Sequence, residues 1–187
     1  KGNTYGINEK TGEIKDIDSG VDLPEEIISR AFRAEIPKVK TQAIAQALIG
    51  AEVEIPRNYQ WYTVKDLIED ETRDWQSSGG HTIAKHISKS DDYLKNRAKT
   101  GTMAIASSYD TVLQALIAIN LAKISNLSRF TTASTKQVFS VDTGGILLGK
   151  GFDKKERCYE KLTTAKVIVM PSSSPKGYRV HTSYPVR

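Results

Sequence analysis

Three histidines, His81, His86 and His181, are the residues of this chain best suited to move protons at neutral pH. The pKa of an unperturbed imidazole lies near neutrality, so the ring can take a proton from one group and give one to another. Cleavage of RNA without a metal ion needs this exchange, because a ribose 2′-hydroxyl must lose a proton and a leaving oxygen must gain one.

The spacing of the first two histidines indicates that they do not act together. Residues four apart share a helix face, which pairs Thr82 with His86 and His81 with Lys85. His81 and His86 are five apart and are expected to point in different directions, so at most one of them is central. A histidine held by a backbone partner is the structural alternative for each.

Arg97 is a candidate phosphate ligand on the helix that follows. It shares a face with Tyr93 and Leu94, and Leu94 can anchor that face on the core. A guanidinium stays charged and matches two phosphate oxygens at once, so Arg97 could direct its fork at a phosphate. Taken by itself, an arginine at such a position is more often a surface residue.

The segment 177–185 alternates between two faces, and either face could line a site. The two groups of side chains are Tyr178, Val180, Thr182 and Tyr184 on one face, and Arg179, His181 and Ser183 on the other. Thr182 and Tyr184 offer hydroxyl donors to a phosphorane, whereas His181 offers a second acid or base. The spacing does not decide between these faces.

Charge is distributed unevenly along the chain. Residues 1–74 contain 10 Lys or Arg and 15 Asp or Glu, whereas residues 75–187 contain 17 and 7, so the net charges are −5 and +10. A basic segment attracts polyanions through its field and through counterion release, which makes nucleic acid the leading partner. A solvated basic face, or attraction to an acidic protein or membrane surface, would give the same pattern.

Other classes of site lack their sequence features. Cys158 is the single cysteine, which excludes an internal disulfide and a zinc site built from cysteines. The chain has no Walker loop and no GxGxxG, HExxH or GxSxG motif, and its basic half lacks the acidic clusters of metal nucleases. The apolar run at 115–122 is too short to span a membrane. We therefore expect chemistry without a metal ion or another cofactor.

Periodicity in residues 75–187 predicts an α+β domain, with helices first and strands after them. Helices are expected at 79–88, at 91–98 with Ser90 as cap and Gly101 as stop, and at 109–124. Strands are expected at 137–141, 146–148, 162–170 and 177–186.

Residues 1–74 show no catalytic grouping. Turn residues predict a small hairpin within 3–18, and helical patterns follow at 22–34, 41–49 and 63–73. The chain begins at Lys1 without a leader, and we expect it to be a fragment of a longer protein. We interpret residues 1–74 as a delivery or packing element beside a basic domain at 75–187.

Two separated motifs of the basic half together resemble one known family. The first is GGHTIAKH at 79–86, continued by Leu94 and Arg97, and the second is GYRV at 177–180, continued by Thr182 and Tyr184. Their order at the two ends of one domain resembles the CdiA C-terminal toxins of the bacterial RNase A-like family, which are effectors of contact-dependent growth inhibition. The resemblance covers about residues 75–187.

The resemblance implies a fold and a site. The fold is a curved antiparallel sheet with helices before and around it, similar to pancreatic ribonuclease but built without disulfides. The implied site residues are His86 as general base, Arg97 and Thr182 as ligands of the transition-state phosphate, and Tyr184 as a phosphate contact or proton donor to the leaving group. The second catalytic histidine of the animal enzymes has no counterpart in this pattern, which leaves the general acid open.

The resulting hypothesis is a metal-independent endoribonuclease toxin, delivered from the surface of a producing bacterium and acting in the cytoplasm of a target bacterium. Its expected partners are an RNA substrate and a cognate immunity protein with an acidic surface, without stable membrane insertion. Residues 1–74 would be the end of a cell-entry region or a linker. The alternatives are a non-catalytic RNA-binding module, against which the 7% aromatic content speaks, and a toxin nuclease of a different fold.

Overall fold

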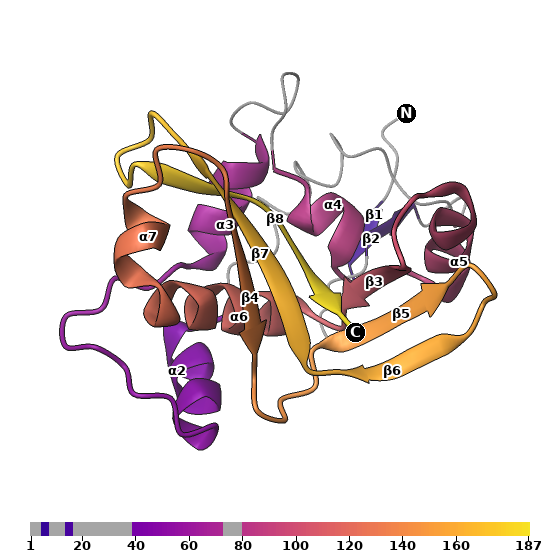
Figure 1. Cartoon of the computed structure of the whole chain (residues 1–187), viewed down its shortest axis with the longest axis horizontal. Helices are drawn as coiled ribbons and strands as arrows, with labels where there is room; N and C mark the ends of the chain where they lie inside the picture. Colours follow the sequence, from indigo (N-terminus) through magenta and orange to yellow (C-terminus); the bar gives the residue numbers. More distant parts are fainter. Residues whose placement is uncertain (1–4, 8–13, 17–38, 73–79) are drawn as a thin grey trace.

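The structure is a computed structural model that describes residues 5–7, 14–16, 39–72 and 80–187 (Figure 1). The helices in these ranges are α2 (Thr41–Gly50), α3 (Val64–Thr72), α4 (Thr82–His86), α5 (Asp91–Thr100), α6 (Val112–Ser125) and α7 (Leu127–Thr131). The strands are β1 (Tyr5–Ile7), β2 (Ile14–Asp16), β3 (Ile105–Tyr109), β4 (Gln137–Asp142), β5 (Gly149–Asp153), β6 (Cys158–Leu162), β7 (Thr164–Pro171) and β8 (Tyr178–Val186). The α+β class predicted for the chain is confirmed.

Two three-stranded antiparallel sheets carry the basic half. One has the order β3-β5-β6 and the other the order β4-β7-β8. Strand β3 connects them, because the Ser107 hydroxyl donates to the carbonyl oxygen of Pro185 at 2.5 Å. The hydroxyls of Tyr109 and Ser183 share a second hydrogen bond of 2.6 Å. The sheets are therefore joined where β3 passes β8.

Helix α6 forms the centre of the hydrophobic core. Its side chains from Ala115 to Ala122 are all buried, so it is apolar on every side and not along a single stripe. Ile44 of α2 and Leu67 of α3 belong to the same core cluster. The buried Asn120 of α6 also accepts a hydrogen bond from the Tyr62 backbone N–H at 2.9 Å. Residues 39–72 thus pack on the basic half, and the domain boundary expected at residue 74 stays a prediction.

Local signals in the sequence placed several helices correctly. Ser90 caps α5 by accepting the backbone N–H of Tyr93 at 3.2 Å, and Gly101 follows the last residue of that helix. Helix α2 matches its expected range to within one residue, and the expected N-terminal hairpin is confirmed by the pairing of β1 with β2. The helix expected at 22–34 lies outside the described residues.

Three predicted elements are corrected by the structure. Tyr109 was expected to begin a helix but ends β3, and α6 starts at Val112. The strand expected at 146–148 is absent from the described structure, and β5 begins at Gly149. Strands β3 and β6 and the short helix α7 were not predicted, and the expected strand 162–170 is divided between β6 and β7. Because β3 precedes α6, the helices of the basic half do not all come before its strands.

Strand β5 was not predicted because its glycines are explained only by a long-range partner. Strand β5 has the sequence GKGFD, and its glycines indicate a turn when they are considered locally. In the fold, a Cβ atom at Gly149 would collide with the carbonyl oxygen of Ser108 on the paired strand β3. Glycine is therefore required there by a close approach between strands that only the tertiary structure creates.

Candidate active site

His86 ends the short helix α4 and is 5% exposed. Its Nδ1 atom lies 3.0 Å from the backbone carbonyl oxygen of Ser107 in β3. A carbonyl oxygen accepts hydrogen bonds and cannot donate them, so Nδ1 must carry the proton in this contact. In the neutral ring, Nε2 is then the nitrogen with the free electron pair.

The surroundings of His86 keep its ring neutral. Burial lowers the pKa of His86 well below its ordinary value, and the positive charge of Arg97 lowers it further. The hydrogen bond to Ser107 acts in the opposite direction but does not outweigh these effects. A neutral imidazole with an available Nε2 can accept a proton, which is what a general base requires.

Arg97 reaches His86 from the neighbouring helix α5. Leu94 anchors α5 with a fully buried side chain, as its spacing predicted. The Arg97 Nη1 atom donates to the carbonyl oxygen of Lys85 at 3.4 Å and lies 3.5 Å from His86 Nδ1. Because both Nη1 and the protonated Nδ1 are donors, the second contact is electrostatic and not a hydrogen bond. The guanidinium therefore stands beside the base as a fixed positive charge.

Tyr184 and Thr182 approach the site from the last strand, β8. The Tyr184 ring centroid lies 5.0 Å from that of His86, with 31° between the ring planes. Thr182 lies two residues earlier and is 4% exposed, and within the described residues its Oγ1 atom has no hydrogen-bond partner. A buried hydroxyl without a partner is costly, so such groups frequently mark places where function outweighs stability.

The three histidines are closer together than their spacing predicted. The ring centroids of His81 and His86 are 6.1 Å apart, and His181 packs edge-on against His81 at 5.0 Å. The expectation that His81 and His86 point in different directions assumed a continuous helix. His81 instead precedes α4 with a non-helical backbone (φ −141°, ψ 28°), so helical periodicity does not apply to it.

The position of His181 also departs from the predicted strand alternation. Ile168 of β7 pairs with Thr182, but the next residue, Val169, pairs with Val180, so His181 is an extra residue in β8. Such a bulge interrupts the alternation of side chains, and Thr182 and Ser183 are consequently both buried. His181 therefore lies beside His81 and not on a face remote from the site.

Two further residues support the site and were missed by the sequence analysis. Ser107 acts through its backbone carbonyl, which every residue type possesses, so no sequence signal could reveal it. Glu71 accepts the backbone N–H of Ile83 at 3.0 Å and thereby holds the start of α4. Its placement near the C-terminal end of α3, where the helix dipole disfavours acidic side chains, is a weak signal that was available.

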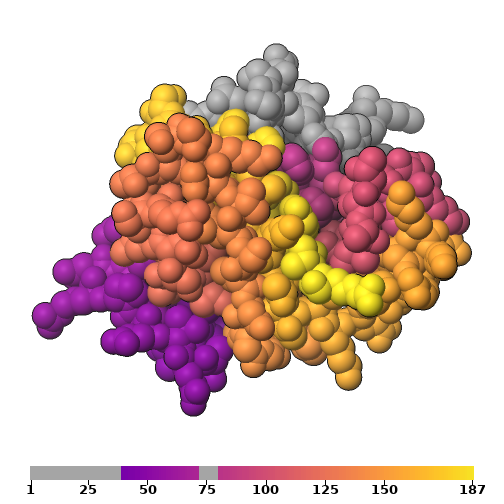
Figure 2. Space-filling model, viewed as in Figure 1, coloured from indigo at the N-terminus to yellow at the C-terminus, as the bar shows by residue number. Residues whose placement is uncertain are grey.

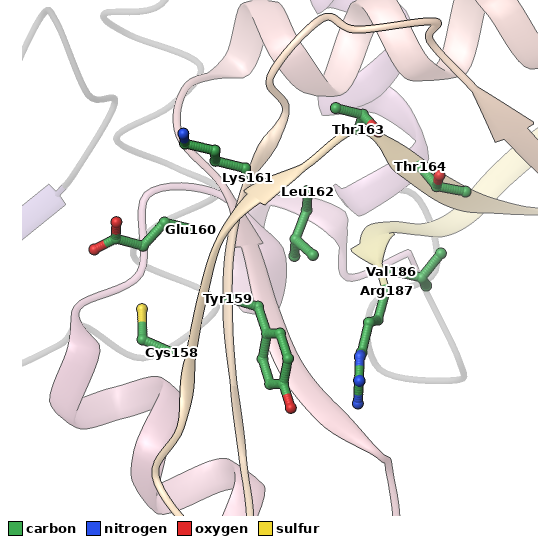
Figure 3. A pocket seen from close by; sticks show the side chains of 9 residues that line it. All are labelled: Cys158, Tyr159, Glu160, Lys161, Leu162, Thr163, Thr164, Val186 and Arg187. Carbon is green, nitrogen blue, oxygen red and sulfur yellow. The ribbon is translucent and has the colours of Figure 1, made fainter.

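The elements that carry the site residues lie side by side on the surface. In Figure 2 the C-terminal strand (yellow) reaches the surface beside the magenta and rose atoms of the α4 and α5 region. A separate pocket of about 690 Å³ lies at β6 and the end of β8, where Tyr159 and Arg187 face each other (Figure 3). The Arg187 guanidinium is 4.7 Å from the Tyr159 ring centroid, and none of the four predicted site residues lines this pocket.

The same residues fall inside a match to a known family. A protein-family model described as "Bacterial CdiA-CT RNAse A domain" matches residues 80–185, which include His86, Arg97, Thr182 and Tyr184. The chain belongs to this family. The match confirms the family that the two motifs predicted, a CdiA C-terminal toxin with an RNase A-like domain, and it supports a ribonuclease of contact-dependent growth inhibition.

A solved structure supports the fold of this CdiA-CT RNase A domain. The crystal structure of a CdiA-CT/CdiI complex from Y. kristensenii 33638 is similar to it, with 25% sequence identity and a TM-score of 0.51. The similarity covers 58% of this chain and 100% of that chain. A search of the curated proteins found no match. Within the described residues, no helix is long and apolar enough to cross a membrane.

Proposed function

We propose that this CdiA-CT RNase A domain is a metal-independent endoribonuclease toxin that acts through His86, Arg97, Thr182 and Tyr184. The observation that carries the proposal is the buried, neutral His86, whose Nδ1 is held by Ser107 while its Nε2 keeps a free electron pair. The basic charge of residues 75–187 supports RNA as the substrate, because each contacted phosphate adds a sequence-independent contribution to binding.

The proposed reaction uses the 2′-hydroxyl of the RNA as nucleophile. His86 Nε2 accepts the proton of this hydroxyl, and the 2′-oxygen forms a bond to the adjacent phosphorus. The bond from phosphorus to the 5′-oxygen breaks, and that oxygen takes a proton from a general acid. The products are a 2′,3′-cyclic phosphate and a free 5′-hydroxyl, and no external water, metal ion or oxidant enters this step.

Arg97 has two effects in this proposal. Its positive charge beside His86 lowers the pKa of the base and keeps it neutral. The same charge can stabilise the negative charge that accumulates on the phosphate oxygens in the transition state. The Thr182 hydroxyl, buried and without a partner in the described residues, would donate a hydrogen bond to the same oxygens.

We propose Tyr184 as the candidate general acid, with His81 as the competing residue. The Tyr184 ring lies beside His86, and its hydroxyl can either contact the phosphate or protonate the leaving oxygen. His81 enters as a competitor because its ring centroid is 6.1 Å from that of His86, which makes it a second imidazole beside the base.

The toxin is proposed to be delivered between bacteria, to act in the target cytoplasm and to bind a cognate immunity protein. The similar solved structure is a complex of a CdiA-CT with CdiI, which supports such a partner here. The net charge of +10 on residues 75–187 favours an acidic surface on that partner, because complementary charge speeds association and excludes wrong partners. Residues 1–74 are proposed to be the end of a cell-entry region or a linker to it.

The test is cleavage of end-labelled RNA by the purified full chain in the presence of EDTA. We expect fragments that carry 2′,3′-cyclic phosphate ends from the parent and almost none from His86→Gln. Cleavage by His86→Gln at the parental rate would refute the site. RNA binding without fragments would instead support a non-catalytic RNA-binding module, and cleavage abolished by EDTA would refute metal independence.

A further inference from the structure

The end of helix α3 carries two adjacent acidic residues that are buried. Asp70 is 4% exposed and Glu71 is 2% exposed, although both lie near the C-terminal end of the helix, where its dipole disfavours negative charge. Burial of a carboxylate is costly unless hydrogen bonds compensate it. The partners of these carboxylates therefore indicate what the two residues do.

Asp70 holds strand β8 a short distance before the site. Its Oδ2 atom accepts the backbone N–H of Val180 at 2.8 Å, and its Oδ1 atom accepts a hydrogen bond from the Lys176 ammonium at 2.6 Å. Its backbone carbonyl accepts the N–H of Gly80 at 3.1 Å. A Cβ atom at Gly80 would lie 2.9 Å from the carbonyl oxygens of Asp70 and Val180, so a glycine is required between them.

Glu71 holds the helix that carries His86. Its two carboxylate oxygens accept the backbone N–H groups of Ile83 at 3.0 Å and Ala84 at 3.4 Å. These belong to the first turn of α4, where N–H groups have no partner inside the helix. His81 occupies the N-cap position but makes no side-chain capping bond to α4 in the described structure. Glu71 thus supplies the cap from 12 residues upstream of Ile83.

The position of α4 depends strongly on such external contacts. The helix has five residues, and a helix of this length is not stable by its own hydrogen bonds. His86 is its last residue, so a tilt or unwinding of the first turn moves the imidazole directly. A carboxylate at the N-terminus opposes this movement through two hydrogen bonds and through a favourable interaction with the helix dipole.

We propose that Glu71 is a positioning residue of the catalytic site, which acts on His86 through helix α4. The proposal rests on the proposed function of His86 as general base. Glu71 lies outside residues 80–185, the part of the chain that matches the family. The proposal therefore gives the end of the N-terminal segment a supporting role for the site, in addition to any role as a linker. Asp70, next to Glu71, accepts the backbone N–H of Val180 in β8, whereas Glu71 accepts that of Ile83 in α4. The C-terminal end of α3 therefore supports both α4 and β8, which carry site residues.

The test compares Glu71→Gln with Glu69→Gln in the full chain. Both changes remove one negative charge from α3, but the Glu69 side chain is 52% exposed and forms a long i,i+4 ion pair with Lys65. Two quantities are measured, the pKa of His86 by NMR titration without RNA, and kcat and KM for a short RNA. The titration needs no catalysis, so it stays informative if the parent fails to cleave RNA and the proposed function is wrong.

For Glu71→Gln we expect kcat to fall about tenfold or more with KM changed much less, because a small displacement of a catalytic group has this effect. We also expect the pKa of His86 to move towards the ordinary histidine value as water enters beside a looser α4. Glu69→Gln should change neither quantity.

Three results would overturn the proposal. The first is a lower melting temperature of Glu71→Gln with the His86 titration and the kcat of the folded protein unchanged, which would show a merely structural role. The second is a change confined to KM. If Glu71→Gln does not fold, Glu71→Asp, which keeps the charge and shortens the side chain, is titrated in its place. The third result is then a parental His86 titration in Glu71→Asp.

Discussion

The Nδ1 atom of His86 donates to the backbone carbonyl oxygen of Ser107 across 3.0 Å, and this contact fixes which imidazole nitrogen can serve a substrate. Ser107 lies in β3, and its hydroxyl donates a hydrogen bond to the carbonyl oxygen of Pro185, which joins β3 to β8. One short segment therefore sets both the tautomer of the base and the location of the strand that carries Thr182 and Tyr184.

Replacing His86 should abolish most of the activity without unfolding the chain. Loss of a general base typically lowers the rate by about 10² to 10⁴-fold, and we expect His86→Gln to fall in this range. Single-turnover cleavage of a short RNA measures the effect, and thermal unfolding checks that the fold is kept. A folded variant that retains more than about a tenth of the parental rate would contradict the assignment.

The stability of the folded protein should fall on acidification because of His86. Its pKa is lowered well below 6.5, chiefly by burial, so the unfolded chain binds more protons than the folded protein below that pH. The contribution of the neutral ring is thus complete above about pH 6.5 and is lost as the pH falls towards the lowered pKa. The pKa of His181 is lowered in the same direction, chiefly by burial.

Urea unfolding between about pH 8 and pH 5 measures this dependence. We expect the free energy of unfolding of the parent to decrease more steeply with falling pH than that of His86→Gln. The acid limb of the parental pH–rate profile should also lie below the ordinary histidine pKa, because the base remains deprotonated there. Equal slopes for the two proteins would show that His86 is not the group that titrates.

Two substitutions of Arg97 should separate its effect on the base from its effect on the phosphate. Arg97→Gln removes a charge that lowers the pKa of His86, so this pKa should rise while cleavage slows. Arg97→Lys keeps the charge but loses the planar fork, so the pKa should remain closer to the parental value while cleavage still slows. NMR titration and kcat measure the two effects, and full activity of Arg97→Lys would argue against a bidentate phosphate contact.

Thr182 should show opposite effects on stability and activity. Its buried hydroxyl has no partner among the described residues, so Thr182→Val, which keeps the shape, should stabilise the fold by about 1 kcal/mol. The same change should lower kcat, because the hydroxyl would no longer reach the transition state. Thr182→Ser retains the hydroxyl and serves as the matched control. A Thr182→Val variant that is more stable and fully active would remove Thr182 from the site.

The general acid can be identified with a substrate that does not need one. We expect Tyr184→Phe to cleave RNA slowly but to cleave a ribonucleoside aryl phosphodiester at nearly the parental rate, because an aryl oxide leaves without protonation. His81→Gln is tested in parallel. Recovery by His81→Gln and not by Tyr184→Phe would transfer the role of general acid to His81.

The sequence alone predicted those features that neighbouring residues determine. The cap at Ser90 and the stop at Gly101 are read from neighbouring residues, and the structure confirms them. The two motifs at the ends of the basic half were sufficient to identify the family. Strand β5 could not be found in this way, because the need for Gly149 arises only from the close approach of Ser108.

The candidate site shows the same division. Residue types and charge indicated three candidate histidines, an arginine that could hold a phosphate and a basic half that suits a polyanion, and the family resemblance singled out His86. Which nitrogen of His86 is free depends on Ser107, 21 residues away, and the support of its helix depends on Glu71 in a separate helix. The bulge that brings His181 beside His81 depends on the pairing of β7 with β8. These contacts arise only when distant segments pack, because periodicity describes a single element and contains no information about its neighbours.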